Sequence, residues 1–485
     1  MFVGTGSDVG KSVINAAFCR IFLQDGYSPA PFKAQNMSLN SYATPGGFEI
    51  GRAQAVQAEA CGIDCSVEMN PILLKPTSDQ TAQVVLNGKP IGNQSAKEYF
   101  LGINRNTLFN EVIKAFNKLD KKYNPIVIEG AGSISEVNLW KNDIVNMRVA
   151  VETNAATFLI ADIDKGGIFG SVYGTLELLP SNERKQIKGI IINKFRGDAD
   201  LFEEGKKILE ELTGIPVVAI IPYYRNIFIE DEDSVVLDKK HGNSLSTKTN
   251  IVVILLKHMS NFTDFNVLER MPDVHLFYTH EIEDVINADI IIIPGSKNTI
   301  HDLLYLRKTG LAKAIITAHR NGKSVYGICG GFQMMGTQIK DPNHVEGSVE
   351  MIPGLGILPV TTILTKEKVT LQCNFTFQKN KEKGKGYEIH MGETFFDDKS
   401  KVKPLCETSA GENDGCFLNA KTWGTYIHGI FDNIFVIQEI LSSIGVQIEL
   451  DFDVEQFKEE QYDKLADLVK NNTNMELVYE ILELK

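Results

Sequence analysis

One cysteine lies in a setting that would make it a nucleophile. Cys329 lies between a β-rich run and a helix-like run, with glycines at Gly327, Gly330 and Gly331. The pattern G-x-C-x-G is that of a nucleophile elbow, a sharp strand-to-helix turn whose neighbouring residues must be small. Such a turn exposes the sulfur above the strand end, and the helix N-terminus beneath it favours the thiolate. An isolated cysteine is more often a buried structural residue, but three glycines in register favour the catalytic interpretation.

The thiol needs a base and an oxyanion hole, and the downstream sequence offers candidates for both. His428 ends a β-like run and is followed by a glycine, whereas His390 lies in the segment Gly386–Gly392 and is a rival base. The N–H that follows the elbow, at Gly330, and one from the loop at Gly295 could stabilise an oxyanion.

Cysteine first and histidine far downstream, on one α/β pattern, resembles the type-1 glutamine amidotransferase family. In that family the cysteine forms a glutamyl thioester and releases ammonia, and the position of its histidine matches His428 better than His390. The glutamate that the family carries two residues after the histidine is replaced here by Ile430. The resemblance therefore implies a dyad of Cys329 and His428 rather than a full triad, a departure typical of the cobyrinate-amidating branch.

The N-terminus carries a glycine-rich loop that ends in Gly-Lys-Ser before a helical run. Backbone N–H groups around Gly6, Asp8 and Gly10 would wrap phosphates, Lys11 would reach the outer ones, and the Ser12 hydroxyl would take a Mg²⁺ position. The loop is one residue longer than G-x4-G-K-[ST] and resembles that of dethiobiotin synthetase and its relatives. The sequence thus predicts an ATP site with Mg²⁺.

A polar stretch follows the next strand. Lys33 would be a second cation facing the phosphates, and the amides of Gln35, Asn36 and Asn40 could bind a polar substrate. The same stretch, taken alone, is equally typical of an ordinary polar loop.

Further side chains stand at or near strand ends. Glu129 ends a buried strand beside a glycine loop, where an α/β nucleotide site holds Mg²⁺. Asn193 is expected to read adenine through its amide, and Asp143 either meets the substrate or caps a helix. Lys75 and Asp79 are expected together at another strand end.

Composition excludes several classes of protein. A net charge of −13 argues against nucleic acid as a partner. The cysteines are scattered without a CxxC pair, which indicates free thiols in a reducing cytoplasm rather than a disulfide framework or a zinc site. The longest apolar runs are too short to span a membrane. The sequence is compatible with a homo-oligomer but does not determine the oligomeric state.

The elements that must position these residues form two α/β domains. We predict a P-loop-type, mostly parallel sheet domain over residues 1–240, which binds ATP, and a type-1 glutamine amidotransferase domain over residues 250–445. The polar stretch between them is the expected linker. The Glu- and Lys-rich remainder, 446–485, is expected to form helices packed on the second domain.

The ordered set of motifs resembles the cobyric acid synthase family. The set includes APFKAQNMSLNS, EIGRAQAVQAEA, NPILLKPTSD, VIEGAGS, IINKFRGD, MSNFTDF, PGSKNT, GICGGFQMMG and GTYIHGIF. The resemblance implies amidation of the b, d, e and g carboxylates of a corrinoid, adenosylcobyrinic acid a,c-diamide, with ATP, Mg²⁺ and glutamine. It also implies that the strand-end faces of both domains meet at a shared cleft or tunnel. Two rivals stay open: the sister enzyme that amidates positions a and c, and a nucleotide-switch ATPase carrying an inert amidotransferase-like domain.

Overall fold

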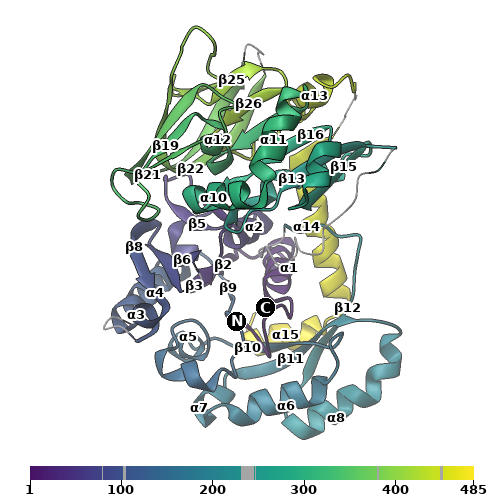
Figure 1. Ribbon diagram of the computed structural model, residues 1–485. Helices are drawn as coiled ribbons and strands as arrows, with labels where there is room; N and C mark the ends of the chain where they lie inside the picture. Colours follow the sequence, from purple (N-terminus) through teal and green to yellow (C-terminus); the bar gives the residue numbers. More distant parts are fainter. Residues whose placement is uncertain are drawn as a thin grey trace.

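The computed structural model in Figure 1 describes residues 1–78, 80–101, 105–230, 245, 247–378, 382–447 and 452–484. Its first domain is built on a parallel sheet in the order β1 (Phe2–Gly4), β10 (Thr157–Asp162), β11 (Ile187–Phe195) and β12 (Val217–Pro222). The parallel pair β2 (Ala30–Phe32) and β9 (Ile126–Ile128) extends it, because Glu129 just after β9 bridges to Phe2 of β1. The predicted α/β, mostly parallel first domain is confirmed.

Helices cover both faces of this sheet. The helices of the first domain are α1 (Lys11–Gln24), α2 (Arg52–Ala60), α3 (Ala96–Leu101), α4 (Arg105–Asp120), α5 (Met147–Glu152), α6 (Ile168–Leu178), α7 (Ser181–Arg184) and α8 (Glu203–Thr213), of which α3 contacts the second, smaller sheet rather than this one. Side chains alternate along each strand, so Phe158 and Ile160 of β10 join the core beneath α1, while Leu159 and Ala161 join the core beneath α6 and α8. Two apolar cores therefore hold the sheet and leave its strand ends free for the phosphate loop.

A second, smaller sheet of the first domain faces the second domain. It runs in the order β3 (Gln35–Met37), β6 (Ile72–Ser78), β7 (Thr81–Leu86) and β8 (Lys89–Ser95), beside the hairpin of β4 (Ser41–Ala43) and β5 (Glu49–Gly51). Lys75 lies within β6, and Asp79, expected beside it, lies outside the described residues.

The second domain contains a six-stranded sheet that is parallel except at one edge. Its order is β15 (Val274–Thr279), β13 (Thr249–Ile254), β16 (Ile290–Ile293), β18 (Ser324–Ile328), β26 (Thr422–Thr425) and the antiparallel β25 (Cys416–Asn419). Around it are α9 (Ile282–Asn287), α10 (Thr299–Thr309), α11 (Leu311–Arg320), α12 (Gly330–Met335), α13 (Ile434–Ser442) and the short pair β14 (Met259–Ser260) and β17 (Gly295–Ser296). Runs such as Ile290–Ile293 are apolar throughout because the strand is buried on both faces.

A long hairpin connects this domain to the first. It consists of β21 (Val360–Phe377) and β22 (Lys383–Phe396), in a sheet that also holds β19 (Gln338–Lys340), β20 (Met351–Pro353), β23 (Cys406–Thr408), β24 (Asn413–Asp414) and β27 (Ile427–His428). Gln372 of the hairpin donates to the carbonyl of Ala43 at 2.9 Å, and Tyr387 packs on Tyr42 with ring centroids 4.6 Å apart. The two domains are therefore in direct contact through β21, β22 and β4.

The C-terminal helices correct one prediction. Helix α14 (Val454–Asn471) runs beside α1, and α15 (Met475–Leu482) packs near β12, so the tail packs mainly on the first domain and not on the second (Figure 1). The reason is its apolar stripe: Tyr462, Leu465 and Val469 are buried in the core that α1 also lines. The ion pair of Arg20 with Asp463 at 2.7 Å also joins α14 to α1.

The predicted linker falls mostly on residues 231–244, which lie outside the described residues. Within the described part of the chain, no helix has both the length and the apolar character needed to cross a membrane.

Candidate active site

The elbow at Cys329 has the strained geometry that its glycines predict. Cys329 has φ 49° and ψ −109° between β18 and α12, a conformation that side chains rarely adopt. A Cβ at Gly331 would lie 1.9 Å from the carbonyl oxygen of Ile293, and one at Gly330 would lie 2.8 Å from the backbone nitrogen of Ser296. Only glycine fits at these positions, so the turn can bring the sulfur against the neighbouring loop.

His428, the predicted base, lies beside this thiol in the structure, and Asp264 holds its ring. The Nδ1 atom of His428 lies 2.7 Å from Oδ2 of Asp264, whose other oxygen accepts the backbone N–H of Gly429 at 2.9 Å. Burial disfavours the charged imidazole, but the Asp264 carboxylate and the Cys329 thiol outweigh it and raise the pKa of His428 to about 10. The arrangement favours an imidazolium at His428 beside the Cys329 sulfur.

The expected dyad is therefore a triad in this structure. Asp264 lies in the 3₁₀ helix Phe262–Phe265 and is fully enclosed, with 3% of its surface exposed. It comes 164 residues before His428, so no local spacing could have indicated the pair. Its signal in the sequence is the motif MSNFTDF, to which the sequence analysis gave no role.

The rival base His390 is already engaged on both ring nitrogens. Its Nε2 lies 3.1 Å from Oε2 of Glu388, its Nδ1 lies 3.1 Å from the carbonyl oxygen of Gly392, and its ring stacks on Tyr426 at 3.8 Å. This geometry favours His428 over His390 as the base.

The two glycines expected at the oxyanion hole both lie next to the triad. Gly295 pairs with Ser260 in the β14–β17 ladder, and a Cβ on it would lie 3.2 Å from Cε1 of His428. Gly330 is the first residue of α12, directly after Cys329. Their N–H groups stay predicted oxyanion donors.

The phosphate loop forms the floor of a cavity of 860 Å³. Asp8, Gly10, Lys11 and Ser12 line it, and Lys11 donates to the carbonyl oxygens of Gly6 at 3.0 Å and of Gly132. Gly10 has φ 95°, and a Cβ on it would lie 2.3 Å from the Asn193 amide, so the loop needs glycine there.

Glu129 is the centre of the polar contacts in this cavity. It is completely buried and accepts hydrogen bonds from Ser12 Oγ at 2.7 Å, Lys33 Nζ at 2.8 Å and Gln57 Nε2 at 2.6 Å. Within the described chain Gln57 Oε1 is buried without a hydrogen-bond partner, and Gln57 lines the cavity. An orphaned amide oxygen beside a carboxylate and a hydroxyl is an oxygen-rich donor set that suits Mg²⁺.

Sequence reasoning missed Gln57. The helix α2 carries several polar candidates, and Arg52, Gln54 and Glu59 were as eligible from their types alone. Only the rotation of the helix decides which side chain reaches Glu129.

The amide of Asn193, for which an adenine contact is predicted, makes hydrogen bonds within the protein, and the adenine contact stays a prediction. Its Nδ2 donates to the carbonyl oxygen of Val9 at 2.8 Å, and its Oδ1 accepts the backbone N–H of Lys194 at 2.9 Å. It is also absent from the described residues that line the 860 Å³ cavity. Asn193 therefore braces the phosphate loop from the neighbouring strand.

Three of the four predicted substrate residues reach the cavity. Gln35, Asn36 and Asp143 line it, although Asp143 also accepts the backbone N–H groups of Val145 at 2.8 Å and Asn146 at 3.0 Å, as a capping residue does. Both predictions for Asp143 thus have geometric support.

Asn40 is the exception, because it belongs to the domain interface. Its Oδ1 accepts the N–H of Phe262 at 3.1 Å, and Asn261 Oδ1 accepts the N–H of Ser41 at 3.1 Å. This reciprocal pair connects the first domain to the 3₁₀ helix that carries Asp264. Asn40 thus has a structural role at the interface, and its substrate contact stays a prediction.

Comparison with known proteins covers both domains. The family profile described as the CobQ/CobB/MinD/ParA nucleotide binding domain matches residues 1–235, and that of the CobB/CobQ-like glutamine amidotransferase domain matches residues 250–434. The cobyric acid synthase of Parabacteroides distasonis is 58% identical over 99% of this chain and 97% of its own, and that of Clostridium novyi is 45% identical over 99% and 97%. A crystal structure of a glutamine amidotransferase matches at a TM-score of 0.32 with 15% identity over 40% of this chain and 99% of its own, a likeness too weak to carry an argument.

Proposed function

This chain belongs to the cobyric acid synthase family, and from that premise we propose that it forms cobyric acid in cobalamin biosynthesis with glutamine as the nitrogen donor. Its substrate is a corrinoid, adenosylcobyrinic acid a,c-diamide, and the groups amidated are the b, d, e and g carboxylates. ATP, bound by the nucleotide-binding first domain, activates each carboxylate.

Ammonia comes from the second domain. His428 takes the proton of Cys329, and the sulfur attacks the side-chain amide carbon of glutamine. The N–H groups of Gly330 and Gly295 stabilise the oxyanion, and His428 returns a proton to the departing ammonia. Water then hydrolyses the thioester to glutamate. Asp264 keeps Nδ1 of His428 protonated throughout, so that Nε2 faces the thiol.

The first domain turns the carboxylate oxygen into a leaving group. Phosphoryl transfer from ATP does this, and Lys11 and Lys33 offset the charge of the transferring group. Ser12 and Glu129, with the amide oxygen of Gln57, would hold Mg²⁺. When bound, Mg²⁺ supplies charge neutralisation at the phosphates.

The nitrogen has to pass from one domain to the other. Free ammonia is mostly protonated near neutral pH, and ammonium is not a nucleophile, so a shielded route favours the reaction. The direct contact of the domains at Asn40 and Asn261 supports such a route. All seven cysteines are buried free thiols, which supports a reducing cytoplasm.

The observation that carries the proposal is the presence of both sites in one chain of this family: a phosphate loop with Glu129, and a Cys329–His428–Asp264 triad. The test is incubation with the corrinoid diamide, ATP, Mg²⁺ and glutamine, followed by mass spectrometry of the corrinoid. Stepwise conversion of carboxyl to carboxamide at b, d, e and g is expected. No conversion of the diamide, with amidation at positions a and c when the unamidated corrinoid is supplied in its place, would identify the sister reaction instead. ATP hydrolysis without amidation of either corrinoid would identify a nucleotide switch.

A further inference from the structure

The imidazole of His428 packs face to face on the ring of Tyr387. The two ring centroids lie 5.4 Å apart, with an angle of 24° between the planes, because the residues are cross-strand neighbours in the antiparallel pair of β22 and β27. Asp264 holds the imidazole by one nitrogen, Nδ1. A ring held by its Cβ and one nitrogen can still turn about the line that joins them, so the face of Tyr387 supplies the constraint that sets the plane of the ring.

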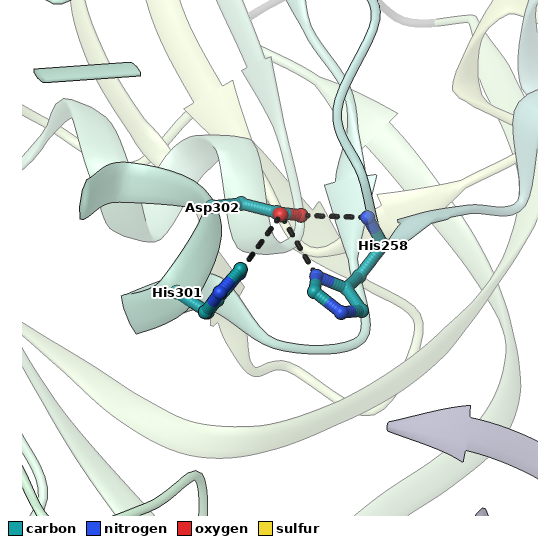
Figure 2. Close-up of side chains that lie close together, drawn as sticks. All are labelled: His258, His301 and Asp302. Carbon is teal, nitrogen blue, oxygen red and sulfur yellow. Dashed lines mark hydrogen bonds and ion pairs between the residues drawn. The ribbon is translucent and has the colours of Figure 1, made fainter. Parts of the chain in front are cut away.

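A loop confines the edge of the same imidazole. A Cβ on Gly295 would lie 3.2 Å from Cε1 of His428, so the backbone of this loop passes close to the ring. Asp302, completely buried, holds the loop in place: it accepts from the Ser296 hydroxyl at 2.7 Å and lies 2.9 Å from Nδ1 of His258 (Figure 2). The loop bounds the ring at its edge and leaves the orientation of its plane to Tyr387.

Tyr387 is in turn held by the first domain. Its ring packs on that of Tyr42 in β4, with centroids 4.6 Å apart. Tyr387 forms a small buried apolar cluster with Ala43 and Ile389, distinct from the larger cores, and Tyr42 packs against this cluster. Because the cluster draws its side chains from both domains, the ring beside His428 keeps its place only while the domains are docked.

Arg52 lies over the ring of Tyr42. Its guanidinium carbon is 4.6 Å from the ring centroid, a distance at which a cation is attracted to an aromatic face. The guanidinium is buried and donates to both carboxylate oxygens of Glu230, at 2.6 and 2.9 Å, and this bidentate contact fixes its orientation. Arg52, Tyr42, Tyr387 and His428 thus form one continuous series of contacts across the domain boundary, which we call the aromatic array.

The aromatic array begins on the helix that reaches the phosphate cavity. Arg52 is the first residue of α2, and Gln57 of the same helix donates to Glu129 at 2.6 Å in that cavity. Because α2 is a single helix of nine residues, the position of its first turn is tied to that of Gln57. The aromatic array therefore connects the wall of the phosphate cavity with the base beside Cys329.

Building on the proposed function, in which His428 is the base for Cys329, we propose that Tyr387 and Tyr42 are positioning residues for glutamine hydrolysis. The aromatic array fixes the plane of the His428 ring so that Nε2 faces the sulfur. The first domain thereby completes the geometry of a base that belongs to the second, and glutamine is hydrolysed at full rate only where the two domains are docked. A displacement of about 1 Å in a reacting group can lower a rate by about 100-fold, which sets the scale of the expected effect.

The first arm of the test replaces Tyr387 in the full-length protein and measures glutamine hydrolysis. Tyr387→Leu should lower kcat by about 10–100-fold. It should leave the KM for glutamine unaltered, because Tyr387 is not among the described residues that line the cavity at Cys329. Tyr387→Phe should retain most of kcat, since it keeps the ring and loses only the hydrogen bond from Nδ2 of Asn261 at 3.3 Å. Amidation supported by ammonium salts should match the wild type in both variants.

The second arm replaces Tyr42, which reaches His428 through Tyr387. Tyr42→Leu should lower kcat by a smaller factor than Tyr387→Leu, and Tyr42→Phe should restore it. The double variant Tyr42→Leu/Tyr387→Leu should be no slower than Tyr387→Leu alone, because both changes break the same series of contacts. Phe417→Leu is the matched control, with wild-type kcat expected, because its ring lies on the edge strand β25, two strands from the strand that leads to Cys329.

Wild-type kcat in Tyr387→Leu, or equal losses in Tyr387→Leu and Tyr387→Phe, would overturn the proposal, as would a loss confined to the KM. Losses that multiply in the double variant would also overturn it, because Tyr42 would then act independently of Tyr387. If Tyr387→Leu shows no cooperative melting curve, the Tyr42 variants decide: full kcat in Tyr42→Leu rejects the aromatic array, and a loss that Tyr42→Phe restores supports it. A wild type that hydrolyses no glutamine would contradict the proposed function itself, whatever the variants do.

Discussion

Replacing Asp264 by asparagine tests the triad most sharply. In the wild type, Oδ1 of Asp264 accepts the N–H of Gly429 at 2.9 Å, and Oδ2 lies 2.7 Å from Nδ1 of His428. In the variant, the asparagine carbonyl can still accept the N–H of Gly429. Its NH₂ group then faces Nδ1 of His428. A donor facing Nδ1 forces the ring proton onto Nε2, which is the atom that must accept the thiol proton. The imidazole is therefore held in the wrong tautomer.

The size of the effect follows from this geometry. In enzymes whose buried aspartate holds a histidine base, the same substitution lowers kcat by about 10⁴-fold with the fold intact. Because thiols ionise more readily than hydroxyls, we expect a loss of about 10²–10⁴-fold in glutamine hydrolysis for Asp264→Asn. Ammonium-supported amidation should persist, since the phosphate site is untouched.

The assay is single-turnover thioester formation with labelled glutamine, alongside ammonium-supported amidation in the same preparations. Asp284→Asn is a matched control, because Asp284 accepts the Thr279 hydroxyl at 2.6 Å in the same domain but away from Cys329. Wild-type rates of thioester formation in Asp264→Asn would refute the reasoning. So would an equal loss in Asp284→Asn.

Three further predictions follow from the two sites. His428→Ala should abolish the thioester burst, whereas His390→Ala should leave most of it; equal losses would remove the ranking of the two bases. Lys11→Ala should lower the rate of amidation by about 10²–10³-fold with either nitrogen donor, whereas Glu129→Gln should raise the Mg²⁺ concentration that gives half-maximal amidation. Glutamine hydrolysis should survive in both variants. An unaltered Mg²⁺ midpoint with full turnover in Glu129→Gln would exclude Glu129 as a Mg²⁺ ligand. The pKa of His428 is raised from 6.5 to about 10, so its pairing with Asp264 should stabilise the fold fully below about pH 6.5 and lose this effect as pH rises through about 10. The Tm difference between wild type and Asp264→Asn should therefore shrink between these pH values. A Tm difference that grows with pH would contradict this prediction.

The parts of the candidate site whose geometry the sequence could indicate are those built from contiguous residues. The elbow at Cys329 needs a strand, glycines and a helix in immediate succession, and each of these leaves a local signature. The same holds for the phosphate loop from Gly6 to Ser12. Glu129 could be placed because a carboxylate directly after a buried strand must lie at the sheet edge.

The parts missed depend on long-range packing. Asp264 reaches His428 only because the 3₁₀ helix and β27 meet in three dimensions. Asn193 and Asn40 have the residue types of ligand contacts, yet their partners in the fold are the backbone at Val9 and Phe262. An amide side chain does not reveal from sequence whether a ligand or the chain itself will satisfy it.

The tail shows the same limit at a larger scale. The apolar positions of α14 predict an amphipathic helix, since residues at helical spacing share one face. They do not say which domain will cover that face. The choice is made by α1, whose apolar side, including Phe18 and Phe22, would otherwise be exposed.

The most direct test of the central claim, that one chain joins a glutamine-hydrolysing triad to an ATP-dependent amidation site, is a change of nitrogen donor in Cys329→Ala. With ATP, Mg²⁺ and the corrinoid diamide, this variant should form no carboxamide from glutamine and should form it from ammonium salts at a rate close to that of the wild type. Loss of amidation with both donors, in a variant shown by its melting curve to be folded, would contradict the account. Glutamine-supported amidation without Cys329 would contradict it as well.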